Sequence, residues 1–149
     1  MKYSRCFALK KALLVRAGGV VLALLFFFAC GKDSSLGIPD VPVNYQITKQ
    51  EFSIRSKNGI LLVNGYGVAG LMLTTNFAGN IVAFDRCSTV NPEKRCAVIP
   101  DENGLTATDT CSGAVFQIGD GAPVKAPAKR SLRQYSVVVT GGSLIRVTN

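Results

Sequence analysis

The five cysteines are the residues of this 149-residue chain with the most evident chemistry. Cys87, Cys96 and Cys111 fall in its second half, whereas Cys6 and Cys30 fall near its start. Thiolates serve as nucleophiles, metal ligands and disulfide partners. The chain contains no histidine, so it lacks both the commonest general base and the commonest metal ligand. We find no catalytic constellation and therefore expect a protein without enzymatic activity.

The start of the chain predicts export across a membrane. Residues 1–16 are basic, and residues 17–29, AGGVVLALLFFFA, form an unbroken apolar run. This run is shorter than the roughly 20 residues of a transmembrane helix and is typical of a signal peptide. We predict a lipoprotein signal-peptide helix over residues 1–29. The alternatives are a plain signal peptide followed by a cysteine that stands there by chance, and an uncleaved anchor.

Cys30 stands directly after this apolar run. The sequence Phe27-Phe28-Ala29-Cys30-Gly31 resembles a bacterial lipobox, although Phe27 replaces the usual leucine. The resemblance implies that Cys30 is acylated and anchors the protein in the lipid bilayer, with residues 30–40 as a polar tether. We therefore expect a cell-envelope protein on the inner or outer membrane, facing the periplasm or the exterior. Disulfides persist in such compartments.

The charge balance argues against nucleic acid as a partner. The formal net charge is +8, but five of the positive side chains lie before residue 17, which leaves +3 for the rest. A domain that binds nucleic acid usually carries a concentrated basic surface. We expect no nucleic-acid binding, and the sequence identifies no protein partner.

Residues 41–149 predict an all-β domain. Short apolar or alternating segments are separated by turn sequences, and no segment after residue 30 shows a helical apolar stripe. The predicted strands cover residues 41–47, 52–54, 60–63, 70–75, 81–84, 114–118, 134–140 and 143–148. Seven or eight short strands favour a small antiparallel sandwich or barrel.

A glycine-rich motif lies between two predicted strands. Residues 65–70, GYGVAG, match the G-x-G-x-x-G pattern of dinucleotide-binding domains. That function requires a following helix whose N-terminus binds the pyrophosphate. The sequence LMLTT follows instead and favours a strand. We interpret the motif as a turn.

One disulfide is expected within the domain. Once Cys6 and Cys30 are set aside, three cysteines remain, so a single bridge leaves one thiol free. A bridge between Cys96 and Cys111 would close a loop of about 15 residues and stabilise the fold by about 3 kcal/mol. The spacing alone does not decide which two of Cys87, Cys96 and Cys111 form the bridge.

The order of features in residues 41–149 resembles that of Rieske-type iron–sulfur domains. Residues 84–89, FDRCST, resemble the first cluster loop, and residues 111–116, CSGAVF, resemble the end of the second. The glycines, prolines, leucine and tyrosine of residues 119–135 then follow in the family's order. The resemblance implies a Rieske-like antiparallel fold, which in this family carries electrons.

The resemblance also identifies the cluster-ligand positions as Cys87, Thr89, Asp109 and Ser112. A Rieske cluster takes two cysteines and two histidines, and only Cys87 matches that set. We therefore expect a Rieske-like domain that has lost its iron–sulfur ligands and has no cofactor. The alternative is a redox or metal-binding protein with a [2Fe-2S] cluster or zinc.

Further expectations concern the remaining side chains of these loops. The resemblance implies a Cys96–Cys111 disulfide that joins the loops, with Cys87–Cys111 as second choice and Cys87 otherwise free. A zinc site of Cys87, Cys96, Cys111 and Asp109 is the metal alternative. The loop acids Asp85, Asp101, Glu102 and Asp109 are expected to be solvated. The favoured function is a non-enzymatic binding, structural or accessory module.

Overall fold

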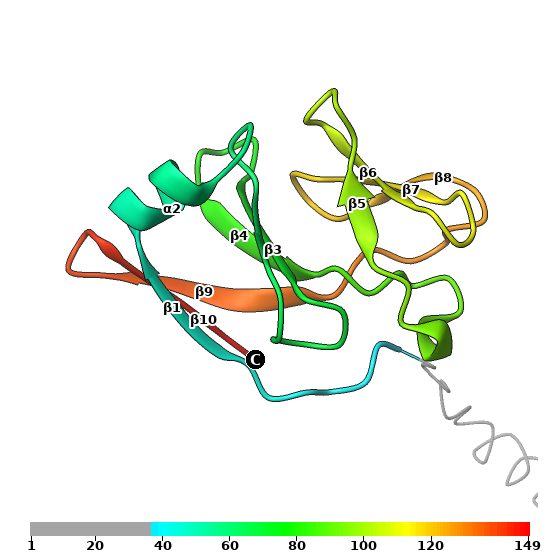
Figure 1. The fold of residues 1–149 in the computed structure, drawn as a ribbon, viewed down its shortest axis with the longest axis horizontal. Helices are drawn as coiled ribbons and strands as arrows, with labels where there is room; N and C mark the ends of the chain where they lie inside the picture. Colours follow the sequence, from blue (N-terminus) through cyan, green and yellow to red (C-terminus); the bar gives the residue numbers. More distant parts are fainter. Residues whose placement is uncertain (1–36) are drawn as a thin grey trace, which may run out of the picture. The chain divides into compact units, whose positions relative to one another are not determined.

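The computed structural model describes residues 37–149 of the chain (Figure 1). The predicted signal peptide, the predicted lipidation site Cys30 and most of the predicted tether lie outside the described residues. Within residues 37–149, no helix has the length and apolar character needed to span a membrane.

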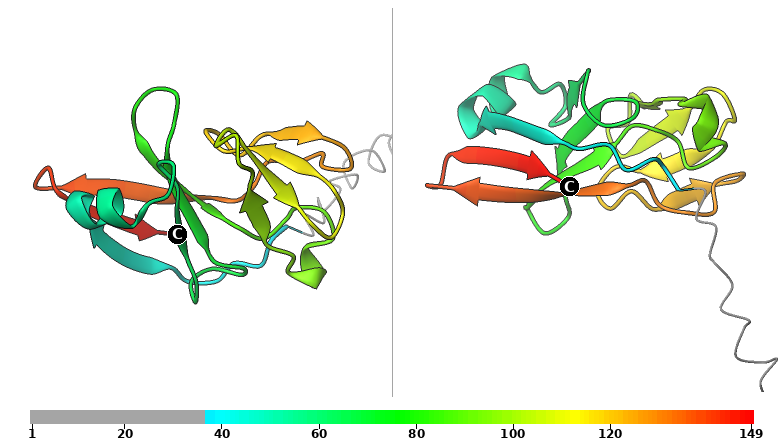
Figure 2. Two further views of the ribbon diagram at one scale, coloured as in Figure 1. Left: turned by 45° about the horizontal axis from the view of Figure 1, so that its top comes forward. Right: turned by 90° about the horizontal axis from the view of Figure 1, so that it is seen from below.

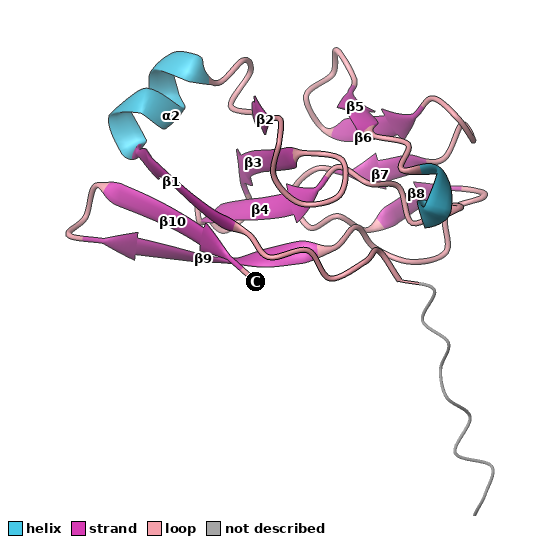
Figure 3. Cartoon of the chain, turned by 60° about the horizontal axis from the view of Figure 1, so that its bottom comes forward, coloured by secondary structure: helices cyan, strands magenta, loops and turns pink. Residues whose placement is uncertain are grey.

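Two antiparallel sheets make up the described part of the chain (Figure 3). One sheet has six strands in the order β1-β10-β9-β4-β3-β2, and the other has four in the order β5-β6-β7-β8. The strands are β1 (Asn44–Thr48), β2 (Leu61–Val63), β3 (Leu71–Thr75), β4 (Ile81–Asp85), β5 (Val98–Pro100), β6 (Thr106–Asp109), β7 (Val115–Gln117), β8 (Pro123–Lys125), β9 (Gln134–Thr140) and β10 (Leu144–Thr148). The predicted all-β fold class is confirmed.

Strands β3 and β4 lie between two apolar cores. Leu71, Leu73 and Ala83 contribute to a core within the six-stranded sheet. Their neighbours Met72 and Phe84 point to the other side and join a core shared with the four-stranded sheet. Since burying a large apolar side chain contributes about 1.5–3 kcal/mol, these two strands connect the halves of the domain energetically as well as spatially.

The first and last strands of the domain lie side by side (Figure 2). β1 pairs with β10 from Asn44, opposite Thr148, to Thr48, opposite Leu144. Beyond the pairing, the Val43 amide donates to the Asn149 side-chain oxygen at 2.6 Å. The edge of the six-stranded sheet is therefore built from the two ends of the described chain.

The predicted strand at residues 52–54 is wrong, because helix α2 (Lys49–Arg55) occupies this segment. The Thr48 hydroxyl accepts from the Glu51 amide at 3.1 Å, and the Glu51 carboxylate accepts from the Thr48 amide at 3.0 Å. This capping box satisfies two amides at the helix start. Phe52 is the only buried residue of this seven-residue helix. The sequence of the helix therefore shows no apolar stripe from which it could have been predicted.

Three observed strands were not expected from the sequence. β5, β6 and β8 have the sequences VIP, TATD and PVK, which are short and contain proline or polar residues. Such segments lack the alternation that identifies a half-buried strand. The other predicted strands are confirmed, with boundaries shifted by a few residues at most, and Gly141-Gly142 forms the turn between β9 and β10 with positive φ at both residues.

Candidate functional site at the two cysteine loops

Two loops carry the residues that the sequence singled out. Loop 1 (residues 86–97) follows β4 and contains the short 3-10 helix η1 (Pro92–Lys94). Loop 2 (residues 110–114) connects β6 to β7. The disulfide Cys96–Cys111 joins the loops, as predicted, and the second-choice pairing Cys87–Cys111 is wrong. The Ser88 amide also donates to the Cys96 carbonyl at 2.8 Å, which folds loop 1 back on itself.

Asp109 organises loop 2 from the end of β6. Its carboxylate accepts from the Cys111 amide at 2.9 Å and from the Ser112 hydroxyl at 2.5 Å, and its own carbonyl accepts from the Gly113 amide at 2.7 Å. Burial by itself raises the pKa of Asp109, but hydrogen bonds from Ser112, Ser88 and the Cys111 amide outweigh it and lower the pKa below its ordinary value. The prediction of a solvated acid is wrong here, because Asp109 is fully buried.

Cys87 is a free and fully buried thiol in loop 1. Its sulfur lies 3.7 Å from the carbonyl oxygens of Ser88 and Pro92. Burial, and next the negative charge of Asp85, raise the pKa of the Cys87 thiol to about 11. The thiolate, which is the reactive form, is therefore disfavoured at neutral pH.

The two hydroxyl side chains at the inferred ligand positions are hydrogen-bonded to the protein. The Thr89 hydroxyl donates to the Arg130 carbonyl at 2.8 Å, which ties loop 1 to the segment before β9. The Ser112 hydroxyl donates to Asp109 within loop 2. Each of these contacts positions a loop. Thr89 is bound to a backbone carbonyl, and the pKa of Asp109, the partner of Ser112, is lowered, so Asp109 is a weak base for activating the hydroxyl.

Asp85 is a second buried carboxylate, at the end of β4 beneath loop 1. Four donors reach it: the amides of Val68, Ala69 and Cys87 at 2.7, 3.2 and 2.8 Å, and the Tyr135 hydroxyl at 2.7 Å. The prediction of a solvated acid is wrong for Asp85 as well. Sequence reasoning missed this anchor.

The glycine-rich motif at residues 65–70 forms a turn, as predicted, and its amides point at Asp85. Gly67 has φ +63°, and a Cβ on it would lie 2.8 Å from the Tyr135 hydroxyl oxygen. Consecutive amides in such a turn form a concave site for an anion. Here the anion is the protein's own Asp85 carboxylate.

Three potential metal-ligand atoms lie close together where the loops meet. The sulfurs of Cys96 and Cys111 and a carboxylate oxygen of Asp109 all lie within 4.8 Å of one another. Cys87 does not belong to this group, so the predicted four-residue metal site is not assembled as proposed. The group combines an exposed Cys111, a half-buried Cys96 and a buried Asp109.

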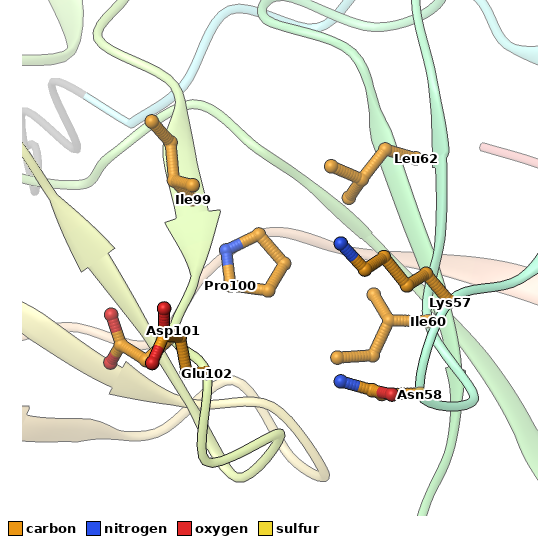
Figure 4. A pocket seen from close by; sticks show the side chains of 8 residues that line it. All are labelled: Lys57, Asn58, Ile60, Leu62, Ile99, Pro100, Asp101 and Glu102. Atoms are coloured by element: carbon orange, nitrogen blue, oxygen red, sulfur yellow. The ribbon is translucent and has the colours of Figure 1, made fainter.

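A groove lies where the edge strands β2 and β5 face each other (Figure 4), and its β5 wall directly follows loop 1 in the sequence. Its volume is about 310 Å³. Figure 4 shows apolar side chains on both walls, with a lysine on one wall and two acids on the other. The lining residues are Lys57, Asn58, Ile60, Leu62, Ile99, Pro100, Asp101 and Glu102. This lining offers contact surface rather than a nucleophile and a base.

The arrangement of two antiparallel sheets with two disulfide-linked loops is the fold of Rieske-type domains. The chain is similar to the plasma membrane Rieske protein PetC3 from Synechocystis PCC 6803. The match covers 74% of this chain and 99% of that one, with 24% identity and a TM-score of 0.52. The chain is also similar to the ferredoxin of carbazole 1,9a-dioxygenase from Nocardioides aromaticivorans IC177, with 17% identity over 74% of this chain and 100% of that one and a TM-score of 0.47. No family model matches the chain, and no curated protein does.

The prediction that the domain has no cofactor is contradicted. Cys96, Asp109 and Cys111 form a group of potential metal ligands within the described part of the chain, in a fold that is similar to that of a Rieske protein. The zinc alternative drawn from the sequence contained all three of these residues, but it also included Cys87, which the structure does not bring to the group.

Proposed function

We propose that this chain is a non-enzymatic accessory module of the cell envelope that uses the Rieske fold as a binding scaffold and has lost the ligands of the Rieske cluster. The observation that carries the proposal is the 2.5 Å hydrogen bond from the Ser112 hydroxyl to the Asp109 carboxylate. These two residues stand at the inferred ligand positions of loop 2. They hold the loop through each other instead of offering a thiolate and an imidazole.

The types of the four residues at these positions support the proposal. A Rieske cluster takes two thiolates on one iron and two imidazoles on the other. The residues here are one cysteine, two hydroxyl residues and an aspartate, and the chain has no histidine. They do not fit that cluster. The buried Cys87, with its raised pKa, is the one donor that remains.

An envelope location is part of the proposal and draws on two independent features. The apolar run that ends at Cys30 is typical of a lipoprotein signal peptide. The Cys96–Cys111 disulfide fits an oxidising compartment, since such bonds are rare in the cytosol. Acyl chains on Cys30 would hold the domain at a membrane surface.

Iron analysis tests the loss of the Rieske ligands. The protein is purified without air from its native membranes and assayed for iron, acid-labile sulfide and visible absorbance. We expect an iron content far below the roughly two atoms per chain that a [2Fe-2S] cluster requires. Two iron atoms with matching sulfide would overturn the proposal.

A variant with restored ligands provides the positive control. Thr89→His, Asp109→Cys and Ser112→His together give the two-cysteine, two-histidine set with Cys87. Both proteins are incubated with iron and sulfide in the absence of air. Cluster absorbance is expected in the triple variant and not in the parent chain, and equal cluster formation in both would contradict the proposal.

The membrane anchor is tested separately. We expect Cys30→Ala to lose incorporation of labelled palmitate and the processing that depends on it, whereas Cys6→Ala keeps both. A Cys30→Ala protein that is still labelled would refute lipid attachment at this residue. This outcome would leave the proposal on the cluster ligands untouched.

A further inference from the structure

We propose that reduction of the Cys96–Cys111 disulfide opens a site for a thiophilic divalent cation of the zinc class, bound by Cys96, Cys111 and Asp109. The three potential ligand atoms already lie within 4.8 Å of one another. The site shares Asp109 with the inferred cluster-ligand set, but its other two ligands are the cysteines that form the disulfide. It does not depend on the proposed accessory function.

The distances require only a small rearrangement. Zinc binds cysteine sulfur at about 2.3 Å and carboxylate oxygen at about 2.0–2.2 Å, so two thiolates on one tetrahedral ion lie about 3.7 Å apart. In the disulfide the sulfurs are 2.02 Å apart, with Cα atoms separated by 6.3 Å. Once the bond is broken, the sulfurs need to separate by less than about 2 Å. Rotation of the side chains can supply most of this movement.

Contacts other than the disulfide keep the two loops in place. In loop 1, Ser88 binds the Cys96 carbonyl, and Cys87 forms a β-bridge with Ala97. In loop 2, the Asp109 amide donates to the Ala114 carbonyl at 2.8 Å. Val98, directly after loop 1, also pairs with Asp109, directly before loop 2, in the β5–β6 ladder. The sulfurs therefore remain close after reduction. A site organised in this way loses less conformational entropy when an ion binds.

Asp109 is oriented to serve as the third ligand. The Cys111 amide and the Ser112 hydroxyl donate to its two carboxylate oxygens, and partners of this kind orient a ligand toward its metal. Asp109 lies buried at the base of the group, whereas Cys111 is exposed to solvent. A reductant and an ion can therefore approach from the side of Cys111, and the fourth coordination position is left for water.

The chemical step uses a dithiol as reductant. The dithiol gives two electrons and two protons to the disulfide, the bond between the sulfurs of Cys96 and Cys111 breaks, and the dithiol becomes a disulfide itself. Zinc then displaces the proton of each thiol and binds two thiolates and one carboxylate. Exchange with a disulfide, which takes the two electrons of the thiolates and two protons from water and becomes a dithiol, would re-form the Cys96–Cys111 bond and release the ion. Occupancy of the site therefore reports the redox state of its surroundings.

The test compares oxidised and reduced protein in metal titrations. The protein is reduced, and the reductant is then removed under anaerobic conditions. The reduced protein is titrated with zinc in competition with a colorimetric chelator. We expect about one zinc ion per reduced chain and less than about a tenth of that in the oxidised chain. Titration with cobalt should give the near-ultraviolet absorbance of thiolate-to-metal charge transfer in the reduced chain only.

Matched variants identify the ligands. The double variant Cys96→Ser/Cys111→Ser should lose binding, and Asp109→Asn should weaken it at least about tenfold. Cys87→Ser, which removes a thiol outside the group, should bind as the wild type does. Equal zinc binding by oxidised and reduced wild type, retention of binding in the double variant, or its loss in Cys87→Ser would each overturn the proposal. Because none of these three comparisons involves Asp109, the proposal remains testable if Asp109→Asn fails to fold.

Discussion

The Tyr135 hydroxyl donates a hydrogen bond of 2.7 Å to the Asp85 carboxylate, across 50 residues of sequence. Tyr135 lies on β9 and Asp85 ends β4, so the bond crosses between neighbouring strands. The same carboxylate accepts from the Cys87 amide at the start of loop 1. One buried acid thus connects the sheet, the glycine-rich turn and the loop that carries Cys87.

Replacement of Asp85 by asparagine should destabilise the domain strongly. An amide has only one accepting oxygen, and its NH2 group would face donors that the carboxylate now satisfies. We expect a loss of about 3 kcal/mol in the free energy of unfolding, measured by urea denaturation. Glu102→Gln, at an exposed position, removes the same charge and should change stability little. Similar losses in both variants would show that charge, and not the hydrogen bonds, is responsible.

Gly67 and Gly65 provide a matched pair for the turn around Asp85. Both have positive φ, +63° and +83°, but only at Gly67 would a Cβ meet Asp85 and Tyr135. Gly65→Ala should cost about 1 kcal/mol from backbone strain alone. Gly67→Ala should cost clearly more, because the buried hydrogen bonds must also shift. Equal unfolding midpoints for the two variants would contradict this account of the turn.

Tyr135 should make stability depend on pH in the alkaline range. Burial and the hydrogen bond to Asp85 raise the pKa of Tyr135 far above its ordinary value near 10. The stabilisation is therefore complete below about pH 10, where the unfolded chain also keeps the proton, and decreases as the pH rises further. Urea midpoints of wild type and Tyr135→Phe from about pH 8 to about pH 12 should converge as the pH rises. A difference in urea midpoint that stays the same at every pH would refute the link between the ionisation of Tyr135 and stability.

The loop disulfide should contribute substantially to stability. Cys96 and Cys111 are 15 residues apart, for which the chain-entropy model gives about 3 kcal/mol. A phosphine reductant with a metal chelator should lower the free energy of unfolding of wild type and of Cys87→Ser by this amount. The reductant should leave the free energy of unfolding of the double variant Cys96→Ala/Cys111→Ala unchanged. A shift in that double variant would point to an effect of the reductant unrelated to the bridge.

Cys87 should resist alkylation in the native protein. Its thiol is buried, and its pKa of about 11 leaves little thiolate at neutral pH. Mass spectrometry after iodoacetamide treatment without reductant should find no label on residues 37–149 in the native state and one label in urea. Rapid labelling of native protein would show that loop 1 opens readily.

The sequence allowed prediction of those elements whose side chains alternate or whose turns require glycine. The strands β9 and β10 and the Gly141-Gly142 turn were found for this reason. Helix α2 was missed because its start depends on two hydrogen bonds between Thr48 and Glu51, and only Phe52 of its residues is buried. β5 and β8 were missed because their proline-containing sequences form strands only through pairing with neighbours.

The candidate site was predicted in part. The resemblance to Rieske-type domains indicated the Cys96–Cys111 bridge, which the structure contains. The burial of Asp85 and Asp109 could not be predicted, since an isolated acid in a loop is usually solvated. Their burial depends on donors that arrive from distant segments, such as Tyr135, and on loop amides whose direction follows from the fold.

The pairing of β1 with β10 sets the order in which the sheet can form. Among the strands of residues 37–149, β1 pairs only with β10, which ends at Thr148. During synthesis from the N-terminus, β1 therefore remains unpaired until about a hundred later residues have been added. Contacts between such distant residues form slowly. The six-stranded sheet is thus completed as a late event, and until then the backbone groups of β1 that bond to β10 remain available to other strands.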